Sequence, residues 1–238
     1  MTLDFIMEKE KNHDNLIIYE DDSILLINKP QGLSTGTGKK ENLCSLIFEK
    51  KPYLLNVKGY KKEEGGLLNR LDNETGGIVL FAKNDEAFKY YHKEMKNYNI
   101  NKIYTTIVQG LPKNKYGIIN CPIAHHYKNI KKMVVINEQS NIKYRGKPRE
   151  AITEWKLIKI KDKEAILEIK IQKGVRHQIR VHLSYIGLPI IGDKLYNKDQ
   201  NSHKFKNHLL YANGIRFIPL GKKEYIEIFT DVPFILDL

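Results

Sequence analysis

The sequence predicts an α+β fold with a mixed, mostly antiparallel central sheet and flanking helices. Strand-like segments often follow one another directly, as at 16–19 and 24–27, instead of alternating with helices as in a Rossmann fold. Hydrophobic residues make up 41% of the 238 residues, which is enough for a substantial core. The length allows one large domain or two small ones, and the chain shows no internal repeat and no long linker.

Strands make up most of the predicted elements. The segment 165–171 alternates apolar and polar residues, which is typical of a half-buried strand. The run 78–81 is continuously apolar and indicates a buried strand. In chain order, strands are expected at 16–19, 24–27, 76–81, 102–109, 165–171, 208–217 and 224–230.

Three helices are predicted between these strands, at 42–49, after Asn84 and over 175–186. Asn84 is a residue type that caps helix N-termini, and acidic residues follow it in the first turn, where the helix dipole favours them. Apolar residues at i, i+3 and i+7 then place one face of this helix against the core. They are Phe88, Tyr91 and Met95.

The charge balance predicts a polyanionic partner. Lys and Arg number 40 against 28 Asp and Glu, giving a net charge of +12. Nucleic acid or an anionic membrane surface would be attracted, and the alternative is a solvated basic surface in a Lys-rich protein. No apolar run approaches the roughly 20 residues of a membrane span, and the N-terminus lacks a signal peptide's apolar region. We therefore expect a cytoplasmic protein that binds RNA or DNA and no membrane.

The histidines and cysteines predict no metal site. His125 and His126 are adjacent, and His177 and His182 are five apart, so neither pair has the i, i+4 spacing of a zinc-binding helix. The two cysteines are far apart in sequence and fit no metal-binding spacing. They are typical of buried thiols in a reducing compartment.

Two basic segments are candidates for binding RNA. The first, 125–149, interleaves tyrosines with basic residues, which can stack on bases and track phosphates; a solvated basic hairpin is the alternative. In the second, 173–196, a helix over 175–186 would put Arg176 and Arg180 on one face at i, i+4. A carboxylate or phosphate between the two guanidiniums would relieve their repulsion, and a solvated helix face is the alternative.

Five segments in order resemble the RluA-type pseudouridine synthases. NRLDNETGGIVLFAK at 69–83 is similar to the family signature H-R-L-D-x-x-T-S-G-L-x-x-x-A-K. Asn69 replaces the usual histidine, Gly76 the usual serine, and Val175 interrupts a usual Gly-Arg-Thr. The other four segments are YEDDSILLINKPQGLST (19–35), KIYTTIVQG (102–110), GKPREAITEW (146–155) and HQIRVHLSYIGLPIIGDKLY (177–196).

The resemblance implies a mixed, mostly antiparallel sheet with a basic RNA-binding cleft, and conversion of uridine to pseudouridine in structured RNA without a cofactor. By motif position, Asp72 is the catalytic aspartate, Tyr104 packs against the target base, and Arg180 pairs with the aspartate. The residues expected to bind RNA are Asn69, Arg70, Lys128, Lys131, Lys132, Arg145, Lys147, Arg176, His177 and Gln178.

The resemblance also implies a domain organisation and a partner. Residues 15–238 would form the catalytic domain after a polar tail at 1–14, which leaves no room for an RNA-binding S4 domain. The partner would be a stem-loop of ribosomal or transfer RNA. We expect a monomer without an obligatory protein partner.

The chemistry explains why one carboxylate is sufficient. A glycosidase needs a second carboxyl group to protonate a departing alcohol. Here uracil departs from the sugar as a stabilised anion but stays in the active site. Asp72 can therefore act alone, either as a nucleophile or as a base. A cation beside Asp72 would favour its charged form. Two alternatives are a non-catalytic RNA-binding or RNA-remodelling protein on the same fold and a glycosylase that releases free base.

Overall fold

The computed structural model describes residues 16–38, 41–137, 141–200 and 204–235, and the predicted tail at 1–14 lies outside this part. The chain divides into two compact units. The first holds Met1–Asn97 with Arg216–Thr230, and the second holds Tyr98–Ile215 with Asp231–Leu238. Most strand pairs are antiparallel and helices are few, which confirms the predicted α+β class.

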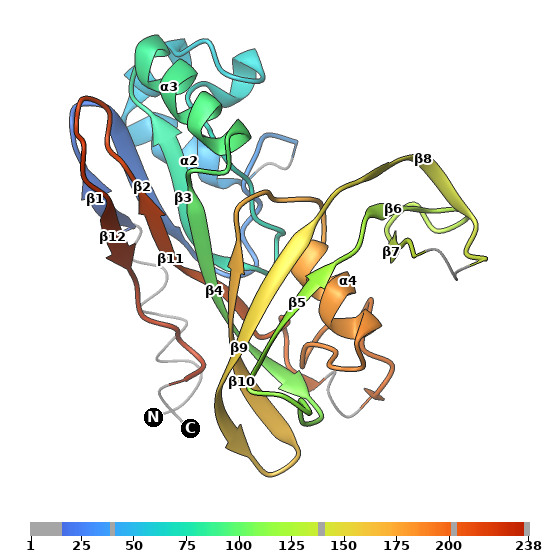
Figure 1. Cartoon of the computed structure of the whole chain (residues 1–238). Helices are drawn as coiled ribbons and strands as arrows, with labels where there is room; N and C mark the ends of the chain where they lie inside the picture. The colour runs from blue at the N-terminus through green and yellow to red at the C-terminus, as the bar shows by residue number, and fades with distance from the viewer. Residues whose placement is uncertain (1–15, 39–40, 138–140, 201–203, 236–238) are drawn as a thin grey trace. The chain divides into compact units, whose positions relative to one another are not determined.

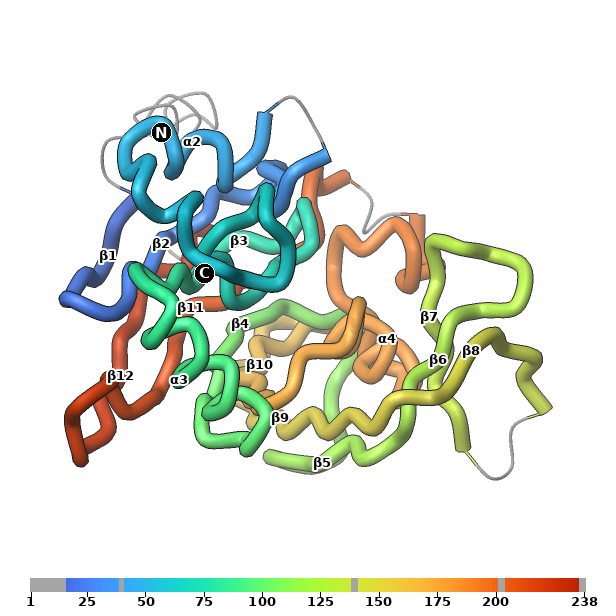
Figure 2. The backbone as a smooth tube through the Cα atoms, turned by 90° about the horizontal axis from the view of Figure 1, so that it is seen from above, coloured from blue at the N-terminus to red at the C-terminus, as the bar shows by residue number. Residues whose placement is uncertain are grey.

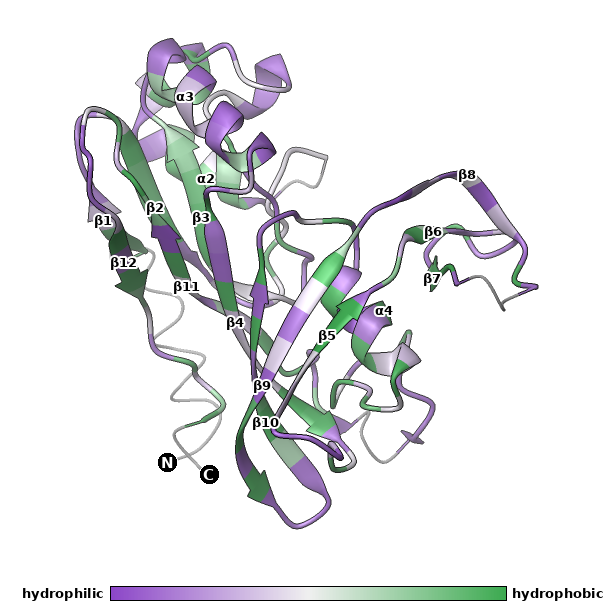
Figure 3. Cartoon of the chain, viewed as in Figure 1, coloured by the Kyte–Doolittle hydropathy of each residue, from purple (hydrophilic) through white to green (hydrophobic). Residues whose placement is uncertain are grey.

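The first unit is built on three antiparallel strands in sequence order, β1 (Ile17–Glu20), β2 (Ile24–Lys29) and β3 (Gly76–Ala82) (Figure 1). Every residue of β3 is buried, as its continuous apolar run predicts, and Figure 3 shows β2 and β3 as mainly hydrophobic. The strand β12 (Ile226–Phe229) also belongs to this unit.

In the described part of the first unit, two helices and two short 3₁₀ turns accompany these strands. In α3 (Asp85–Lys96) the Asn84 side chain accepts a hydrogen bond from the Ala87 N–H at 2.9 Å, which confirms the predicted N-cap. Phe88 and Tyr91 are buried on the inner face of α3, as their spacing predicts. The other elements are α2 (Leu43–Lys50) and the 3₁₀ turns Pro52–Asn56 and Lys62–Glu64.

The second unit contains a larger sheet in the order β11-β4-β10-β9-β5. The central pair, β4 and β10, is antiparallel and regular, with Tyr104 opposite Ile169. The strands β5 and β9 were not predicted from the sequence. The strands are β4 (Asn101–Gln109), β5 (Tyr116–Asn120), β9 (Ile152–Lys161), β10 (Glu164–Ile171) and β11 (Leu210–Phe217), which begins in this unit.

A three-stranded sheet in the order β7-β6-β8, here called the basic sheet, forms from the basic segment. Its strands are β6 (Ile123–His126), β7 (Met133–Val135) and β8 (Tyr144–Arg149). Figure 2 shows it on the far side of helix α4 (Gln178–Tyr185) from β10. An apolar cluster packs it against this region: Ile123, Met133, Val135, Ala151, Val175 and Val181.

Candidate active site

Asp72 lies in a tight turn immediately before β3. The Thr75 N–H donates to the Asp72 carbonyl at 3.0 Å, and Gly76 then starts the buried strand. The Asp72 side chain is half-buried. The turn therefore places a carboxylate at the point where the chain enters the core.

The loop after β2 holds this turn in place. The Thr35 hydroxyl donates to the Leu71 carbonyl at 2.9 Å and accepts from the Leu71 N–H at 3.2 Å. The Gly32 N–H donates to the Asn73 carbonyl at 2.7 Å. The residues on both sides of Asp72 are thus fixed to one loop, which limits how far the carboxylate can move.

Lys29, at the end of β2, is a residue that the sequence reasoning missed. It is fully buried, and its ammonium donates to the carbonyls of Pro30 (3.0 Å), Leu33 (2.8 Å) and Asn73 (3.2 Å). Burial lowers the pKa of Lys29 to about 7, although the negative charge of Asp72 opposes this change. The signal in the sequence was a lysine at the end of an apolar strand and directly before a proline.

Asn69 and Arg70 lie just before the turn and contact protein groups. The Asn69 amide accepts from the Leu80 N–H at 2.8 Å and donates to the Ile78 carbonyl at 3.4 Å, so it pairs with the backbone of β3. Arg70 is exposed, and its guanidinium forms an ion pair with the buried Glu64 carboxylate. Both side chains fix the segment that leads to Asp72.

Tyr104 is buried in the middle of β4, in the second unit. Lys102 lies two residues earlier, on the same face of the strand. Burial lowers the pKa of Lys102 to about 8. This face therefore carries a phenol and a lysine that loses its proton more readily than usual.

Arg180, on α4, is held by a second acid that the sequence reasoning did not identify. Its guanidinium donates to Asp193 through Nε (2.7 Å) and Nη2 (2.9 Å), and both side chains are buried. Burial would raise the pKa of Asp193, but the hydrogen bonds and charge of Arg180 outweigh this effect and lower it. Such a bidentate pair fixes the guanidinium plane. The pairing of Arg180 with Asp72 stays a prediction.

The prediction that Arg176 and Arg180 share a helix face is wrong. The helix α4 begins at Gln178, because His177 adopts a left-handed conformation with φ of 55°. The Gln178 side chain also accepts from the Val175 N–H at 3.0 Å, which turns the chain before the helix. Arg176 instead reaches the β6–β7 turn, where it donates to the Ile130 carbonyl at 3.3 Å.

A buried polar network joins α4 to the strands that lead into the basic sheet. The Gln178 amide donates to the Ile152 carbonyl (2.9 Å) and the Thr153 hydroxyl (3.2 Å). His182 contacts the Thr153 hydroxyl at 2.8 Å and the Cys121 carbonyl at 3.0 Å. Since a carbonyl only accepts, the His182 Nε2 carries the proton and Nδ1 accepts from Thr153.

The basic sheet and its β6–β7 turn carry five of the ten residues predicted to bind RNA. Figure 3 shows β8 as strongly hydrophilic. The His126 imidazole accepts from the backbone N–H groups of Lys128 (3.1 Å) and Asn129 (3.0 Å), which shapes the β6–β7 turn. The basic residues predicted to bind RNA here are Lys128, Lys131, Arg145 and Lys147, all exposed, and the half-buried Lys132.

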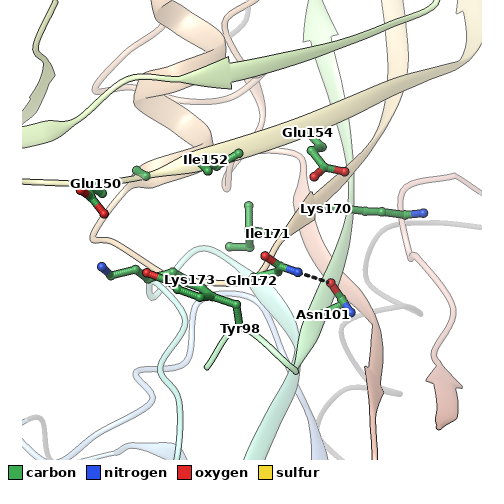
Figure 4. Close-up of a pocket in the computed structure, with 10 residues that line it drawn as sticks. Tyr98, Asn101, Glu150, Ile152, Glu154, Lys170, Ile171, Gln172 and Lys173 are labelled. Atoms are coloured by element: carbon green, nitrogen blue, oxygen red, sulfur yellow. Dashed lines mark hydrogen bonds between the residues drawn. The ribbon is translucent and has the colours of Figure 1, made fainter. Parts of the chain in front are cut away.

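A pocket of about 280 Å³ lies elsewhere in the second unit. It is lined by residues of β4, β9 and β10 with both signs of charge, including Glu150, Glu154, Lys170 and Lys173 (Figure 4). Gln172 donates to Asn101 across its floor at 3.2 Å. The described lining residues include none of those predicted for the active site.

Neither a metal cluster nor a membrane-spanning helix is found within residues 16–235 as far as they are described. No three His, Cys, Asp or Glu side chains there are grouped so that they could hold a metal ion. None of the described helices is long and apolar enough to cross a membrane.

Known proteins are similar to this chain in sequence and in fold. The family model for RNA pseudouridylate synthase matches residues 23–185. The ribosomal large subunit pseudouridine synthase C of Buchnera aphidicola is 33% identical over 239 residues, covering 97% of this chain and 72% of that protein. The ribosomal large subunit pseudouridine synthase D of Borreliella burgdorferi is 30% identical over 221 residues, covering 91% and 65%. The chain thus spans about two thirds of the length of these relatives.

A solved structure, human RNA Pseudouridylate Synthase Domain Containing 1, shows the same fold. It matches with a TM-score of 0.75 at 21% identity, covering 95% of this chain and 87% of that chain. The chain belongs to the RNA pseudouridylate synthase family. This result confirms the resemblance to RluA-type enzymes and the expected enzyme class, an isomerase.

Proposed function

We propose that this chain isomerises uridine to pseudouridine in RNA, with Asp72 as the essential carboxylate. The observation that carries the proposal is the Asp72 turn, which lies in the family signature and is anchored through Asn73 by a buried lysine, Lys29. The names of the two relatives support ribosomal RNA as the substrate. Transfer RNA is the alternative substrate.

The reaction breaks the bond between the sugar C1′ and uracil N1, turns the base and forms a bond from C1′ to C5. Asp72 assists as a nucleophile on C1′ or as a base on the sugar. The negative charge of Asp72 opposes the fall in the pKa of Lys29, so the buried ammonium interacts with the carboxylate that either route uses. No second carboxyl is needed because uracil is never released.

Tyr104 and Arg180 serve the flipped base in this proposal. Extracting uridine from folded RNA costs a few kcal/mol, of which stacking on Tyr104 returns about 1–3 kcal/mol. Arg180 supports the negative charge of Asp72 or of the departing uracil. The Asp193 carboxylate, which binds two of its nitrogens, keeps the guanidinium in one orientation for this task.

The basic sheet holds the RNA backbone, together with Arg70, Arg176 and His177. Exposed lysines and arginines neutralise phosphates by releasing counterions. For Asn69 and Gln178 we propose a structural role, because protein groups already occupy their amides. We further propose that one copy of the chain suffices and that the reaction takes place in the cytoplasm.

An assay of purified protein on ribosomal RNA from cells that lack the gene tests this proposal. Pseudouridine is mapped by selective labelling, and free uracil is measured by chromatography. Wild type and Asp22→Asn, which alters an exposed acid, should form pseudouridine, whereas Asp72→Asn should form none while binding RNA within a few-fold. Pseudouridine formation by Asp72→Asn would overturn the role of Asp72, and uracil release by wild type would indicate a glycosylase.

A further inference from the structure

Tyr196 lies in the segment after α4, and its backbone is tied to the groups around Arg180. Its N–H donates to the Asp193 carboxylate at 3.1 Å, the same carboxylate that binds Arg180. Its carbonyl accepts from the Ser184 hydroxyl of α4 at 3.0 Å. The side chain is therefore carried on a rigid support beside Arg180.

The ring of Tyr196 contacts Arg180 and His177, and its hydroxyl contacts Met133 and His177. The Arg180 guanidinium carbon lies 5.3 Å from the ring centre, within cation–π range. The hydroxyl accepts from the Met133 N–H of β7 at 2.8 Å and lies 2.9 Å from the His177 Nδ1. One hydroxyl can serve both partners because it has one donor and two acceptor sites. Tyr196 thus joins a strand of the basic sheet directly to Arg180.

The contact with Met133 is well placed to transmit a movement of the basic sheet. Met133 is buried in the apolar cluster that packs the basic sheet against Val175 and Val181. The β6–β7 turn just before it carries Lys131 and Lys132. RNA that binds this turn and changes its conformation therefore also acts on β7, whose Met133 N–H binds the Tyr196 hydroxyl.

We propose that Tyr196 is a positioning residue that couples RNA binding on the basic sheet to the orientation of the Arg180 guanidinium. The inference rests on the proposed function, which assigns RNA to the basic sheet and a catalytic role to Arg180. RNA bound to the basic sheet holds β7 in place, and β7 holds the Tyr196 hydroxyl through the Met133 N–H. The Tyr196 ring then packs on one face of the Arg180 guanidinium, while Asp193 fixes the plane of that guanidinium.

A second tyrosine provides a matched control. The Tyr185 hydroxyl accepts from the Asn137 amide at 2.6 Å, so it also joins α4 to the chain that leaves β7. Tyr185 is exposed and lies at the C-terminal end of α4, beyond Arg180. Tyr185→Phe therefore removes a comparable hydrogen bond but leaves the Tyr196 hydroxyl and its contact with β7 intact.

The test measures the single-turnover rate constant at saturating RNA and, separately, RNA affinity. Tyr196→Phe keeps the ring and removes the hydroxyl with its contacts to Met133 and His177. We expect the rate constant to fall about five- to tenfold and RNA affinity to stay within about twofold. Tyr185→Phe should match wild type in both. Thermal unfolding of each variant checks the fold, and if Tyr196→Phe does not fold, His177→Asn removes the other hydroxyl partner and should lower the same rate constant.

A double-mutant cycle separates coupling from a merely structural role. The double variant Lys131→Glu/Tyr196→Phe should have a single-turnover rate constant at saturating RNA no lower than that of the slower single variant. The reason is that both substitutions interrupt the same series of contacts from the β6–β7 turn to Arg180. Losses that multiply, or a Tyr196→Phe rate constant within twofold of wild type, would overturn the inference. Wild-type protein that forms no pseudouridine would instead refute the proposed function.

Discussion

Lys29→Met tests whether a desolvated ammonium supports the Asp72 turn. The pKa of Lys29 falls from 10.5 to about 7 on folding, which corresponds to about 5 kcal/mol. Between these two pH values the unfolded chain binds a proton that the folded chain does not. The free energy of unfolding of wild type should therefore rise from pH 7 towards pH 10.5, by up to about 5 kcal/mol relative to Lys29→Met.

Below pH 7, Lys29→Met has two opposite effects on the free energy of unfolding. Lys29→Met removes the cost of burying a charge but leaves the Pro30, Leu33 and Asn73 carbonyls without their donor, at about 1–3 kcal/mol each. Near pH 6 the variant should thus be within a few kcal/mol of wild type, and at pH 10 clearly less stable. Its activity should fall at both pH values, because the Asp72 turn loses an anchor.

Urea unfolding at pH 6, 8 and 10 measures these differences, with Lys89→Met on the exposed face of α3 as the control. The control should keep a constant difference from wild type at all three pH values. A stability difference between wild type and Lys29→Met that does not change with pH would show instead that the Lys29 ammonium is not desolvated.

Two further predictions concern the basic sheet and the buried network. Replacing Lys128, Lys131 and Lys132 with Glu should weaken RNA binding and reduce the slope of log K against log salt by about two to three. The matched control replaces Lys89, Lys93 and Lys96 on α3 with Glu and should change this slope little. Unchanged binding and slope in titrations would remove the basic sheet from the RNA interface. Burial lowers the pKa of His182 from 6.5, so wild type should lose stability as the pH falls below 6.5. In thermal unfolding, His182→Gln should lose this pH dependence of stability, whereas His125→Gln, which changes an exposed histidine, should keep it. Equal pH dependence of the two variants would contradict this role.

The sequence predicted the elements whose signals are local. Asn84 caps α3 because its side chain meets an N–H three residues on, and an apolar run such as β3 is buried wherever it lies. The strands β5 to β9 were missed, and the pairings of β5 with β9 and of β6 with β8 join segments that are well separated in sequence. In β8 the residues YRGKPR show no apolar alternation, so the hydrogen bonds to β6 alone define the strand.

The candidate site was predicted less completely, because its supporting residues depend on tertiary contacts. Asp72, Tyr104 and Arg180 could be named from motifs. The burial of Lys29 could not, since a lysine in a strand normally faces water and here meets three carbonyls supplied by the loop and the turn. Likewise, the left-handed backbone of His177 makes α4 begin at Gln178 and not at residue 175, which sequence periodicity does not reveal.

A pseudouridine map of total RNA is the measurement to make first, because it asks whether this chain forms pseudouridine through Asp72. RNA from cells with and without the gene is labelled and sequenced, and the gene is then returned as wild type or as Asp72→Asn. If Asp72 is the essential carboxylate, a mark disappears with the gene, returns with wild type and stays absent with Asp72→Asn. A mark restored equally by Asp72→Asn would contradict this role.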